Sequence, residues 1–447
     1  MTRLFGTDGV RGEANSVITA EFSLALAVAG AEVLTDGDRP THAGTAILAR
    51  DPRASGEFIS AAIAAGIAST GVDVLDIGVV PTPTLAHLTA TMDVDFGVMV
   101  SASHNPMPDN GIKFFDSNGH KLTDEVEDEI EKALGQPRSR PTGANVGRIT
   151  REPHLVGSYL DHMVATIPHR LDGLKIVVDC AHGAASAVGP AALRSAGAEV
   201  IVTAADPDGL NINDGVGSTH LGPLQQAVVE HQADAGVAFD GDADRCLAVD
   251  ELGQIVDGDQ ILGILALAFQ AQGNLTDDTF VATKMSNLGL LRAMEEAGIN
   301  VVTTDVGDRY VLQEMARHGY NLGGEQSGHV LVTDFSTTGD GVLTALQLLG
   351  NLASSKLTLS QMAGGIPKMP QVMINVANVK KEKTYTDSGL LGALLRAEES
   401  LAKTGRILLR PSGTENLVRV MVEAEDQATA QHWAEELARE VRERLGN

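Results

Sequence analysis

The feature that most constrains this chain is a regular alternation of apolar strand-like runs with amphipathic helix-like stretches over its first three quarters. The runs "TAILAR" (45–50), "VDVLDIG" (72–78) and "FGVMVS" (96–101) are separated by two helix-like segments. Such βαβαβ units fold as strands of a parallel sheet covered by helices. Two further units begin at "KIVVDC" (175–180) and "TFVATKM" (279–285). The sequence therefore predicts an α/β protein with three related βαβ-type units.

The last part of the chain has a different pattern. From about Gln371 it is rich in strand-like segments, and it closes with the helical pattern of residues 428–445, whose Trp433 we assign to packing. Polar stretches rich in Gly and Pro separate domains, and here they lie near residues 135–147, 250–258 and 364–371. The four predicted segments are residues 1–150, 151–255, 256–368 and 369–447.

Charge and hydropathy exclude several classes of partner. With 33 Lys+Arg against 59 Asp+Glu the net charge is −26, which opposes nonspecific binding to nucleic acid or anionic lipid. The apolar run at residues 261–269 is too short for a membrane span, which needs roughly 20 residues, and we expect a core helix there. Cys180 and Cys246 give no disulfide framework and suit a reducing compartment. The N-terminus has no signal-peptide pattern. We therefore expect a cytoplasmic protein without nucleic-acid or membrane partners.

Three carboxylates at alternating positions, Asp240, Asp242 and Asp244, follow the apolar run "GVAF". A hard divalent cation takes several oxygen ligands at about 2.0–2.6 Å, and Gly241 allows a tight loop that turns the carboxylates inward. An EF-hand is disfavoured because Arg245 stands where that loop requires glycine. A solvated acidic turn is the alternative, although like charges crowded after a core strand repel unless something neutralises them. The pattern predicts a divalent metal site.

The stretch "VMVSASHNPMPDNGIKFF" (98–115) places two serines and a histidine at the end of an apolar strand. Ser103 is the candidate nucleophile, because a hydroxyl at a strand terminus, held by a His-Asn-Pro turn, is expected to be stationary and exposed. An Asx-type turn with satisfied hydroxyls is the alternative, and the absence of a Gly-x-Ser-x-Gly elbow disfavours a serine hydrolase. Lys113 is expected on a strand after a turn at residues 110–111, as a proton donor, a phosphate contact or a solvated lysine.

The segment "RPSGTEN" (410–416), with Arg419 beyond it, is the strongest candidate for binding phosphate. It offers hydroxyls, closely approaching amides and forked guanidinium donors, although an ordinary type I or II turn has the same composition. Near the N-terminus, "FGTDGVRG" is expected to place Arg11 in a glycine-flanked turn, either near a phosphate or in a plain turn. The candidate phosphate-binding residues are Arg11, Arg410, Ser412, Gly413, Thr414 and Arg419.

The segment "GGEQSGHVLV" combines Glu325, Ser327 and His329 between glycines. An acceptor, a hydroxyl and a ring nitrogen suit the hydroxyl groups of a sugar, whereas a hairpin turn with incidental polar residues is the alternative. A further segment, "GDRYV", offers Asp308 and Arg309 at a strand-to-helix junction, where a helix N-cap aspartate is the simpler interpretation.

In this order and at these separations, the four loops resemble those of the α-D-phosphohexomutase superfamily. "SASHNP" resembles its phosphoserine loop, "DGDADR" its metal loop, "GEQSGH" its sugar-binding loop and "RPSGTEN" its phosphate-binding loop. One departure is Asn416, where the family pattern commonly has proline, which loosens the loop but removes no donor. The resemblance implies an α/β fold in which three related βαβ-type domains with mixed sheets and a smaller α+β C-terminal domain, each carrying one of these loops, surround a central cleft.

The resemblance also implies a mechanism. Ser103 would carry a phosphoryl group and pass it to the substrate, and the hexosamine bisphosphate would turn end for end before its other phosphate returned to the serine. Lys113 or His329 would handle the hydroxyl proton, with a hexose or hexosamine bisphosphate as activator. The implied catalytic residues are Ser103, Lys113, His329 and Arg245. The implied Mg²⁺ ligands are Ser103, Asp240, Asp242 and Asp244. The implied substrate-binding residues are Arg11, Glu325, Ser327, Arg410, Ser412, Gly413, Thr414 and Arg419.

"FGTDGVRG", "GDRYV" and Gln326 are most similar to the branch of the superfamily that acts on an amino sugar. The expected reaction therefore interconverts glucosamine 6-phosphate and glucosamine 1-phosphate and supplies UDP-N-acetylglucosamine for the cell wall of a bacterium. The alternatives are a mutase of glucose or mannose phosphates, a metal-dependent sugar phosphatase, and a module that only binds sugar phosphate. The expected partner is a small hexosamine phosphate, and a homodimer is expected from the resemblance alone.

Overall fold

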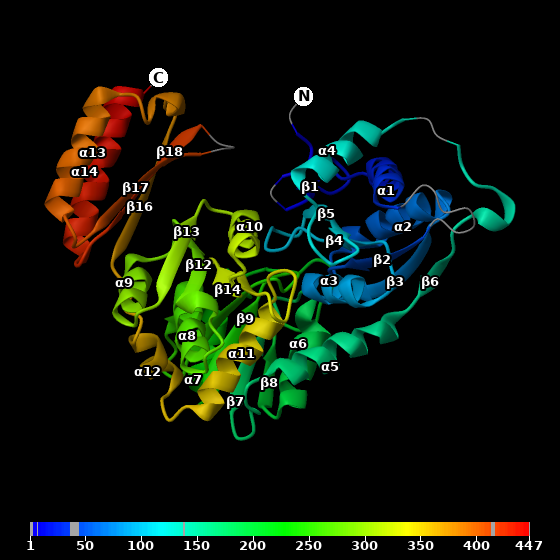
Figure 1. Cartoon of the computed structure of the whole chain (residues 1–447), viewed down its shortest axis with the longest axis horizontal. Helices are drawn as coiled ribbons and strands as arrows, with labels where there is room; N and C mark the ends of the chain where they lie inside the picture. Colours follow the sequence, from blue (N-terminus) through cyan, green and yellow to red (C-terminus); the bar gives the residue numbers. More distant parts are fainter. Residues whose placement is uncertain (1–2, 7, 36–43, 137–138, 413–415, 447) are drawn as a thin grey trace. The chain divides into compact units, whose positions relative to one another are not determined.

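The computed structural model describes residues 3–6, 8–35, 44–136, 139–412 and 416–446 (Figure 1). The chain forms two compact units. One consists of Met1–Lys284 and Ile299–Gly364, and the other of Met285–Gly298 and Gly365–Asn447. Short 3₁₀ helices occur at η1 (Gly143–Asn145), η2 (Pro153–Leu155), η3 (Thr276–Asp278) and η4 (Lys381–Lys383).

The first sheet of the larger unit has the strand order β1-β5-β4-β2-β3-β6. Its inner strands β2, β3 and β4 are parallel, whereas β1 and β5 are antiparallel to their neighbours, so the sheet is mixed. The strands are β1 (Val10–Glu13), β2 (Thr45–Arg50), β3 (Asp73–Val79), β4 (Phe96–Val100), β5 (Asp109–Asp116) and β6 (Ile149–Arg151). The helices of this part are α1 (Ala20–Leu34), α2 (Ala54–Ser69), α3 (Thr82–Thr91) and α4 (Asp124–Ala133).

The two faces of this sheet carry separate apolar cores. Leu48 and Val98 pack with α1 and α2 on one face, whereas Ile47 and Met99 pack with α3 on the other. Because β4 is buried on both faces, its sequence is a continuous apolar run instead of an alternation. The carboxyl end of β4 is therefore held rigidly, and the candidate nucleophile follows it.

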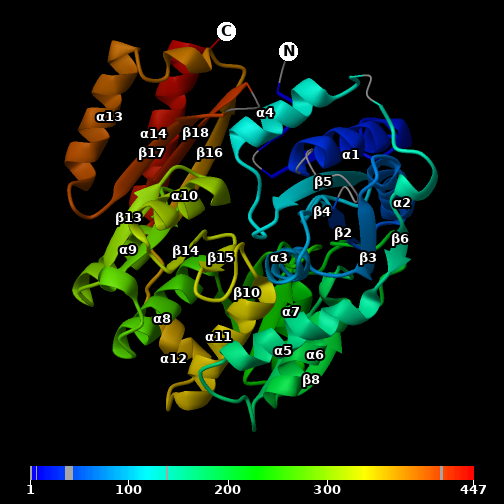
Figure 2. The same ribbon diagram turned by 45° about the vertical axis from the view of Figure 1, so that its right-hand side comes forward.

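The second sheet of the same unit has the order β11-β10-β9-β7-β8. Its strands β7, β8 and β9 are parallel, and the hairpin of β10 and β11 adds antiparallel pairs. The strands are β7 (Lys175–Asp179), β8 (Glu199–Thr203), β9 (Ala235–Phe239), β10 (Cys246–Asp250) and β11 (Ile255–Val256). The helices are α5 (Val156–Thr166), α6 (Ala185–Ala196) and α7 (Gly222–His231). Figure 2 shows α5 below the first sheet, beside α3.

The third sheet has the order β13-β12-β14-β15 and is again mixed. Its strands are β12 (Thr279–Thr283), β13 (Asn300–Thr304), β14 (Leu322–Gly324) and β15 (Val330–Val332). Its helices are α8 (Gly258–Ala271), α10 (Asp308–His318), α11 (Gly341–Ser354) and α12 (Leu359–Gly364). The run at residues 261–269 lies within α8 and is largely buried, which confirms the predicted core helix.

The smaller unit contains α9 (Leu288–Glu296) and the fourth sheet, which is antiparallel with the order β16-β18-β17. Its other elements are β16 (Gln371–Ala377), β17 (Arg406–Pro411), β18 (Leu417–Glu423), α13 (Ser388–Leu401) and α14 (Gln427–Leu445). The helices α13 and α14 lie side by side on this sheet (Figure 1). Trp433 on α14 packs against their shared core, as predicted.

The mixed sheets with flanking helices confirm the predicted α/β class. The four predicted segment boundaries stay a prediction. Cys180 and Cys246 are free and buried, in agreement with the absence of a disulfide framework. Within the described part of the chain, no helix combines the length and the apolar composition needed to cross a membrane. One local prediction is wrong: residues 110–111 belong to β5 and do not form a turn, because they pair with residues 11 and 12 of β1.

Candidate active site

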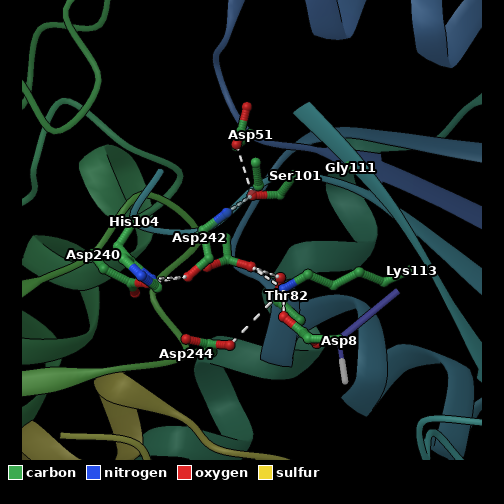
Figure 3. Close-up of polar contacts among 12 residues, drawn as sticks. Asp8, Asp51, Thr82, Ser101, His104, Gly111, Lys113, Asp240, Asp242 and Asp244 are labelled. Atoms are coloured by element: carbon green, nitrogen blue, oxygen red, sulfur yellow. Dashed lines mark hydrogen bonds and ion pairs between the residues drawn. The ribbon is translucent and has the colours of Figure 1, made fainter. Parts of the chain in front are cut away.

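Ser103 lies just beyond β4 in a left-handed backbone conformation, with φ of 53°. Its N–H donates to Ser101 Oγ over 2.9 Å, and the Ser101 hydroxyl in turn donates to Asp51 Oδ2 over 2.7 Å (Figure 3). A non-glycine residue adopts this conformation only at a cost of about 1–2 kcal/mol, so surrounding contacts must hold it. The loop is therefore fixed by its neighbours.

The main contact that holds this loop is Arg53, which is fully buried and which the sequence did not single out. Its Nη2 donates to the carbonyl oxygens of Ser103 (2.9 Å) and Asn105 (2.8 Å). Its Nη1 donates to those of Pro106 (2.6 Å) and residue 109 (3.0 Å), and its Nε donates to Asp51 Oδ2 (2.9 Å). All five guanidinium N–H groups are thus used by one loop and one carboxylate. The sequence signal that could have identified Arg53 is its position, with Asp51, directly after the buried strand β2.

The three aspartates among the predicted metal ligands lie in the loop between β9 and β10. Asp240, Asp242 and Asp244 are all buried, and one oxygen from each lies within 4.8 Å of the others. Asp242 Oδ2 accepts hydrogen bonds from Thr82 Oγ1 (2.6 Å) and Lys113 Nζ (2.8 Å). Asp242 Oδ1 and Asp244 Oδ1 are buried without a hydrogen-bond partner. Carboxylates converging from three residues, two of which have an oxygen without a hydrogen-bond partner, fit a hard divalent cation such as Mg²⁺.

The serine loop and the aspartate loop meet directly. Ser103 Oγ donates to Asp240 Oδ2 over 2.5 Å, although these loops follow strands of different sheets. A Cβ on Gly241 would lie 2.5 Å from the Ser103 carbonyl oxygen, so the two backbones approach as closely as glycine permits. The expectation that the Ser103 hydroxyl is exposed is wrong: its side chain is fully buried, because the aspartate loop covers it.

Burial and mutual repulsion set the protonation of the aspartates. Burial, together with the charges of Asp244 and Asp242, raises the pKa of Asp240 to about 7. Burial opposes ionisation of Asp244 as well, but His329 and then Lys113 outweigh it and lower its pKa. The cluster thus contains one carboxyl group with a raised pKa, that of Asp240, and one with a lowered pKa, that of Asp244.

Lys113 extends from β5 into this cluster (Figure 3). Its Nζ lies 2.8 Å from Asp242 Oδ2, 2.8 Å from Asp8 Oδ2 and 3.9 Å from Asp244 Oδ2. Burial disfavours its charge, but Asp242 and Asp8 outweigh burial and raise its pKa. The alternative of a solvated strand lysine is excluded, because its side chain is 1% exposed.

Two arginines approach from other elements. Arg11 lies on β1 and not in the expected turn, because residues 10–13 pair with β5. Its Nη2 donates to Asp8 Oδ2, and its Nη1 lies 3.5 Å from the Ala102 carbonyl oxygen, next to the nucleophile. Arg245 follows the aspartates, with its Nε 3.8 Å from Asp244 Oδ1. His104, whose Nδ1 lies 3.3 Å from Ser103 Oγ, has its pKa lowered to about 4 by burial and by these two arginines.

The candidate sugar-binding residues lie in the hairpin loop between β14 and β15. Glu325 accepts hydrogen bonds from the Gly307 N–H (3.0 Å) and from Ser327 Oγ (3.3 Å). His329 is buried, and its Nδ1 lies 3.7 Å from Asp244 Oδ1. Burial opposes protonation of His329, but Asp244 outweighs it and raises the pKa of the ring. Because His329 faces an aspartate of the second sheet, it joins the cluster around Ser103.

Asp308 is not the helix N-cap that the sequence suggested. Gly307 occupies that position, and Asp308 is the first residue of α10. The Asp308 carboxylate instead lies 2.5 Å from Lys121 Nζ and 3.6 Å from His329 Nε2. Lys121 and Asp8 were not identified from the sequence. Lys121 lies outside the quoted motifs, and only Arg11 was singled out in "FGTDGVRG", which contains Asp8.

The candidate phosphate-binding hairpin belongs to the smaller unit. Arg410 on β17 and Arg419 on β18 are direct register partners, so their side chains leave the same face of the hairpin. Two like charges placed opposite each other favour a bound anion between or above them. Ser412 is largely buried and donates its N–H to the Leu417 carbonyl oxygen over 2.9 Å. Gly413 and Thr414, also predicted to bind phosphate, lie outside the described residues.

In the larger unit, the structure thus brings together the predicted nucleophile, the aspartates, Lys113, Arg11, Arg245 and His329. A buried hydroxyl next to a carboxylate cluster that can hold a cation, surrounded by cationic side chains, can bind and transfer a phosphoryl group. The roles assigned to the individual residues stay predictions.

Comparison with known proteins agrees with this chemistry. The chain matches family models described as phosphoglucomutase/phosphomannomutase, alpha/beta/alpha domains I, II and III and C-terminal domain. The matched residues are 2–140, 157–253, 257–369 and 373–440, respectively.

Two relatives illustrate the sequence similarity. A phosphoglucosamine mutase of Paenarthrobacter aurescens is 60% identical over 451 residues, covering 100% of this chain and 98% of the relative. A phosphoglucosamine mutase of Streptomyces coelicolor is 57% identical over 452 residues and covers 100% of both chains.

Solved structures share the fold. A phosphoglucomutase/phosphomannomutase family protein from Burkholderia thailandensis superposes with a TM-score of 0.83 at 24% identity, over 99% of this chain and 98% of that chain. The Aspergillus fumigatus N-acetylphosphoglucosamine mutase, solved with GlcNAc-6P and magnesium, has a TM-score of 0.66 at 18% identity, over 98% of this chain and 95% of that chain.

Proposed function

Because the chain belongs to the phosphoglucomutase/phosphomannomutase family, we propose that it catalyses the reaction of a phosphoglucosamine mutase. Its substrates are then glucosamine 6-phosphate and glucosamine 1-phosphate, which it interconverts by intramolecular phosphoryl transfer. The full-length relatives at 57–60% identity carry this name, which favours the amino sugar over glucose or mannose phosphate.

One observation carries the mechanism: the Ser103 hydroxyl lies 2.5 Å from a carboxylate of the aspartate cluster. In the proposed cycle a phosphoryl group on Ser103 moves to a substrate hydroxyl, so the serine O–P bond breaks while the sugar O–P bond forms. Lys113 or His329 handles the hydroxyl proton. The bisphosphate turns around within the protein, and its other phosphoryl group returns to the serine oxygen.

The remaining residues have proposed binding roles. Arg11 and Arg245 neutralise the reacting phosphate, since both lie at the serine loop or the aspartate loop. Glu325 and Ser327 bind sugar hydroxyls. The phosphate that is not reacting binds to the hairpin of the smaller unit, through Arg410, Ser412, Gly413, Thr414 and Arg419.

We further propose that Asp240, Asp242 and Asp244, with an oxygen of the phosphorylated Ser103, hold Mg²⁺. The orphaned oxygens of Asp242 and Asp244 support this assignment. A bound Mg²⁺ supplies charge neutralisation at the phosphoryl oxygens. In a chain of net charge −26, the cationic side chains around Ser103 supply the rest.

The phosphoserine can be tested by the mass of the intact protein. The purified protein should carry one phosphate that maps to Ser103, and Ser103→Ala should lack it and lose mutase activity by at least about 10³-fold. A Ser103→Ala protein with full activity would rule out the mechanism. Release of inorganic phosphate at the rate of turnover would instead indicate a sugar phosphatase.

The substrate can be tested by comparing kcat/KM for glucosamine, glucose and mannose phosphates. The amino sugar should be preferred, and equal values would contradict the substrate assignment. A cytoplasmic location, a role in supplying UDP-N-acetylglucosamine and a homodimeric state belong to the same proposal. Two free, buried cysteines are compatible with a reducing compartment.

A further inference from the structure

The charged residues around the candidate site form a closed ring of alternating sign. From Asp244 the ring passes to Lys113 (3.9 Å), then to Asp8 (2.8 Å), and from Asp8 to Lys121 (2.5 Å). It continues from Lys121 to Asp308 at 2.5 Å. His329 closes it, with its Nε2 3.6 Å from Asp308 Oδ2 and its Nδ1 3.7 Å from Asp244 Oδ1.

Lys121 pairs with two carboxylates of this ring, those of Asp8 and Asp308. It lies after β5, and its side chain is 15% exposed, whereas the side chain of Lys113 is 1% exposed. Neither of its carboxylate partners belongs to the aspartate cluster. Each partner instead contacts a predicted proton-handling residue, since Asp8 pairs with Lys113 and Asp308 faces His329. The ion pairs of Lys121 therefore link it to both predicted proton-handling residues, through one carboxylate each.

The ring also connects elements of three sheets. Lys121, Lys113 and Asp8 come from the first sheet and its loops, and Asp308 from the start of α10 beside the third. Without Lys121, Asp8 and Asp308 would keep their charges in a largely buried place with one partner fewer. Removing one partner of a buried ion pair leaves an uncompensated charge, which favours movement of the carboxylate toward solvent or toward another cation. Either movement would displace Lys113 or His329.

A neighbouring ion pair provides a matched comparison. Arg309 also joins α10 to α4, through Glu127 at 3.1 Å and through Asp124. It stands next to Asp308 in sequence, but its guanidinium pairs with these carboxylates of α4, which lie outside the ring. The same junction therefore contains one cation that belongs to the ring and one that only connects two helices.

We propose that Lys121 is a positioning residue, which holds Asp8 against Lys113 and Asp308 against His329 during phosphoryl transfer. This inference rests on the proposed function and extends it to a residue whose ion pairs are with Asp8 and Asp308 and not with the aspartate triad. Lys121 affects the placement of the proton-handling side chains and leaves the affinity for the sugar phosphate unchanged.

The test compares Lys121→Met with Lys121→Arg and Arg309→Met in the full chain. Since a misplacement of about 1 Å costs on the order of 10²-fold in rate, we expect Lys121→Met to lower kcat by about 10²-fold with KM nearly unchanged. Lys121→Arg, which can still pair both carboxylates, should recover most of the loss. Arg309→Met should lower the melting temperature but not kcat.

Two further measurements separate this inference from a purely structural effect. NMR spectra that correlate ring protons with ring nitrogens can follow His329 in the substrate-free protein. The His329 signal is identified because it disappears in His329→Gln. It should shift in Lys121→Met and stay in place in Arg309→Met. The kcat loss from Lys121→Met should shrink to a few-fold in an Asp308→Asn background, because residues acting in one network are not additive. An unmoved His329 signal or an unchanged kcat would overturn the inference. A wild-type protein inactive on every hexose phosphate would overturn the proposed function, and the spectra would still decide the role of Lys121.

Discussion

Ser103 owes its position to side chains that lie far from it in sequence. Arg53 precedes it by 50 residues and binds the carbonyl oxygens of Ser103 and Asn105. The sequence predicted Ser103 as a nucleophile from its own neighbourhood, at the end of an apolar strand. Arg53 could not be predicted in the same way, because "DPRASG" says nothing about which loop its guanidinium faces. At this scale, the sequence pattern predicted candidate reacting groups, and only the structure identified the side chains that hold them.

Replacing Arg53 should damage both stability and turnover. Arg53→Met leaves Asp51 buried without its cation and should cost about 3–5 kcal/mol in the free energy of unfolding. In the fraction that folds, kcat should fall by about 10²-fold, because the serine loop loses its carbonyl contacts. Denaturant unfolding and the mutase assay measure the two effects. Arg170→Met, which removes an exposed pair with Asp172, is the control and should change neither.

His87 predicts how stability depends on pH. Its ring stacks on that of His162 with centroids 4.6 Å apart, and burial, followed by the charge of His162, lowers its pKa to about 4. An unfolded histidine titrates near 6.5, so between about pH 6.5 and 4 the unfolded chain binds the proton more readily. Stability should therefore fall as the pH is lowered through this window.

Thermal unfolding between pH 7 and pH 4.5 tests this sign. Between these pH values the melting temperature of His87→Gln should fall less than that of the unmodified protein. The melting temperature of His154→Gln, a change at an exposed position, should fall as much as that of the unmodified protein. His104 has a pKa lowered in the same direction, so some acid loss should persist in His87→Gln. If the two variants lose melting temperature equally with acid, His87 is not responsible.

At the scale of elements, the alternation of strands and helices was predictable because each βαβ unit has its own hydrophobic period. The strand pairing at the edges of the sheets could not be predicted in this way. Residues 110–111 look like a turn but continue β5, since β1 supplies the backbone partners. Likewise, the pattern at Asp308 suggests a helix cap, yet tertiary charge pairing with Lys121 determines where its carboxylate lies. In both cases contacts from a distant segment override a local preference.

The close approach of the serine and aspartate loops predicts the effect of a single methyl group. In Gly241→Ala the new Cβ would lie 2.5 Å from the Ser103 carbonyl oxygen and 2.9 Å from Asn213 Nδ2. One loop must shift, and kcat/KM should fall by about 10²-fold. Gly157→Ala is the control, since a Cβ at that position of α5 would meet nothing within 4 Å. It should leave activity intact and, by helix propensity, increase stability by up to about 1 kcal/mol. Equal activity of the two variants would contradict the proposed contact.

At the scale of the whole molecule, the sequence showed that an acidic chain must gather its cations locally to bind phosphate. It could not show which segments meet. Asp8, Lys121 and Asp308 are separated by more than a hundred residues each, and their ring exists only because three sheets place their loops together. Long-range charge networks of this kind leave no periodic trace in a sequence.

The cluster of three aspartates, brought together by the fold, predicts that turnover depends on a divalent metal. Removal of divalent cations with a chelator should abolish turnover, and Mg²⁺ should restore it, because the orphaned oxygens of Asp242 and Asp244 then regain a partner.

The pKa of Asp240 is raised to about 7, so below that pH the metal must displace a proton. Mg²⁺ affinity measured by calorimetry should therefore weaken as the pH falls from 8 to 6. A pH-independent affinity would contradict the assignment of Asp240 as a ligand.

The two buried cysteines have a practical consequence. Burial raises the pKa of both Cys180 and Cys246, so neither should react readily with maleimide dyes. Cysteines introduced by Arg151→Cys in the larger unit and Glu443→Cys in the smaller one would then be the labelled sites, because both positions are exposed. A fluorescent donor and acceptor attached there would report the separation of the two units in solution, with and without a sugar phosphate.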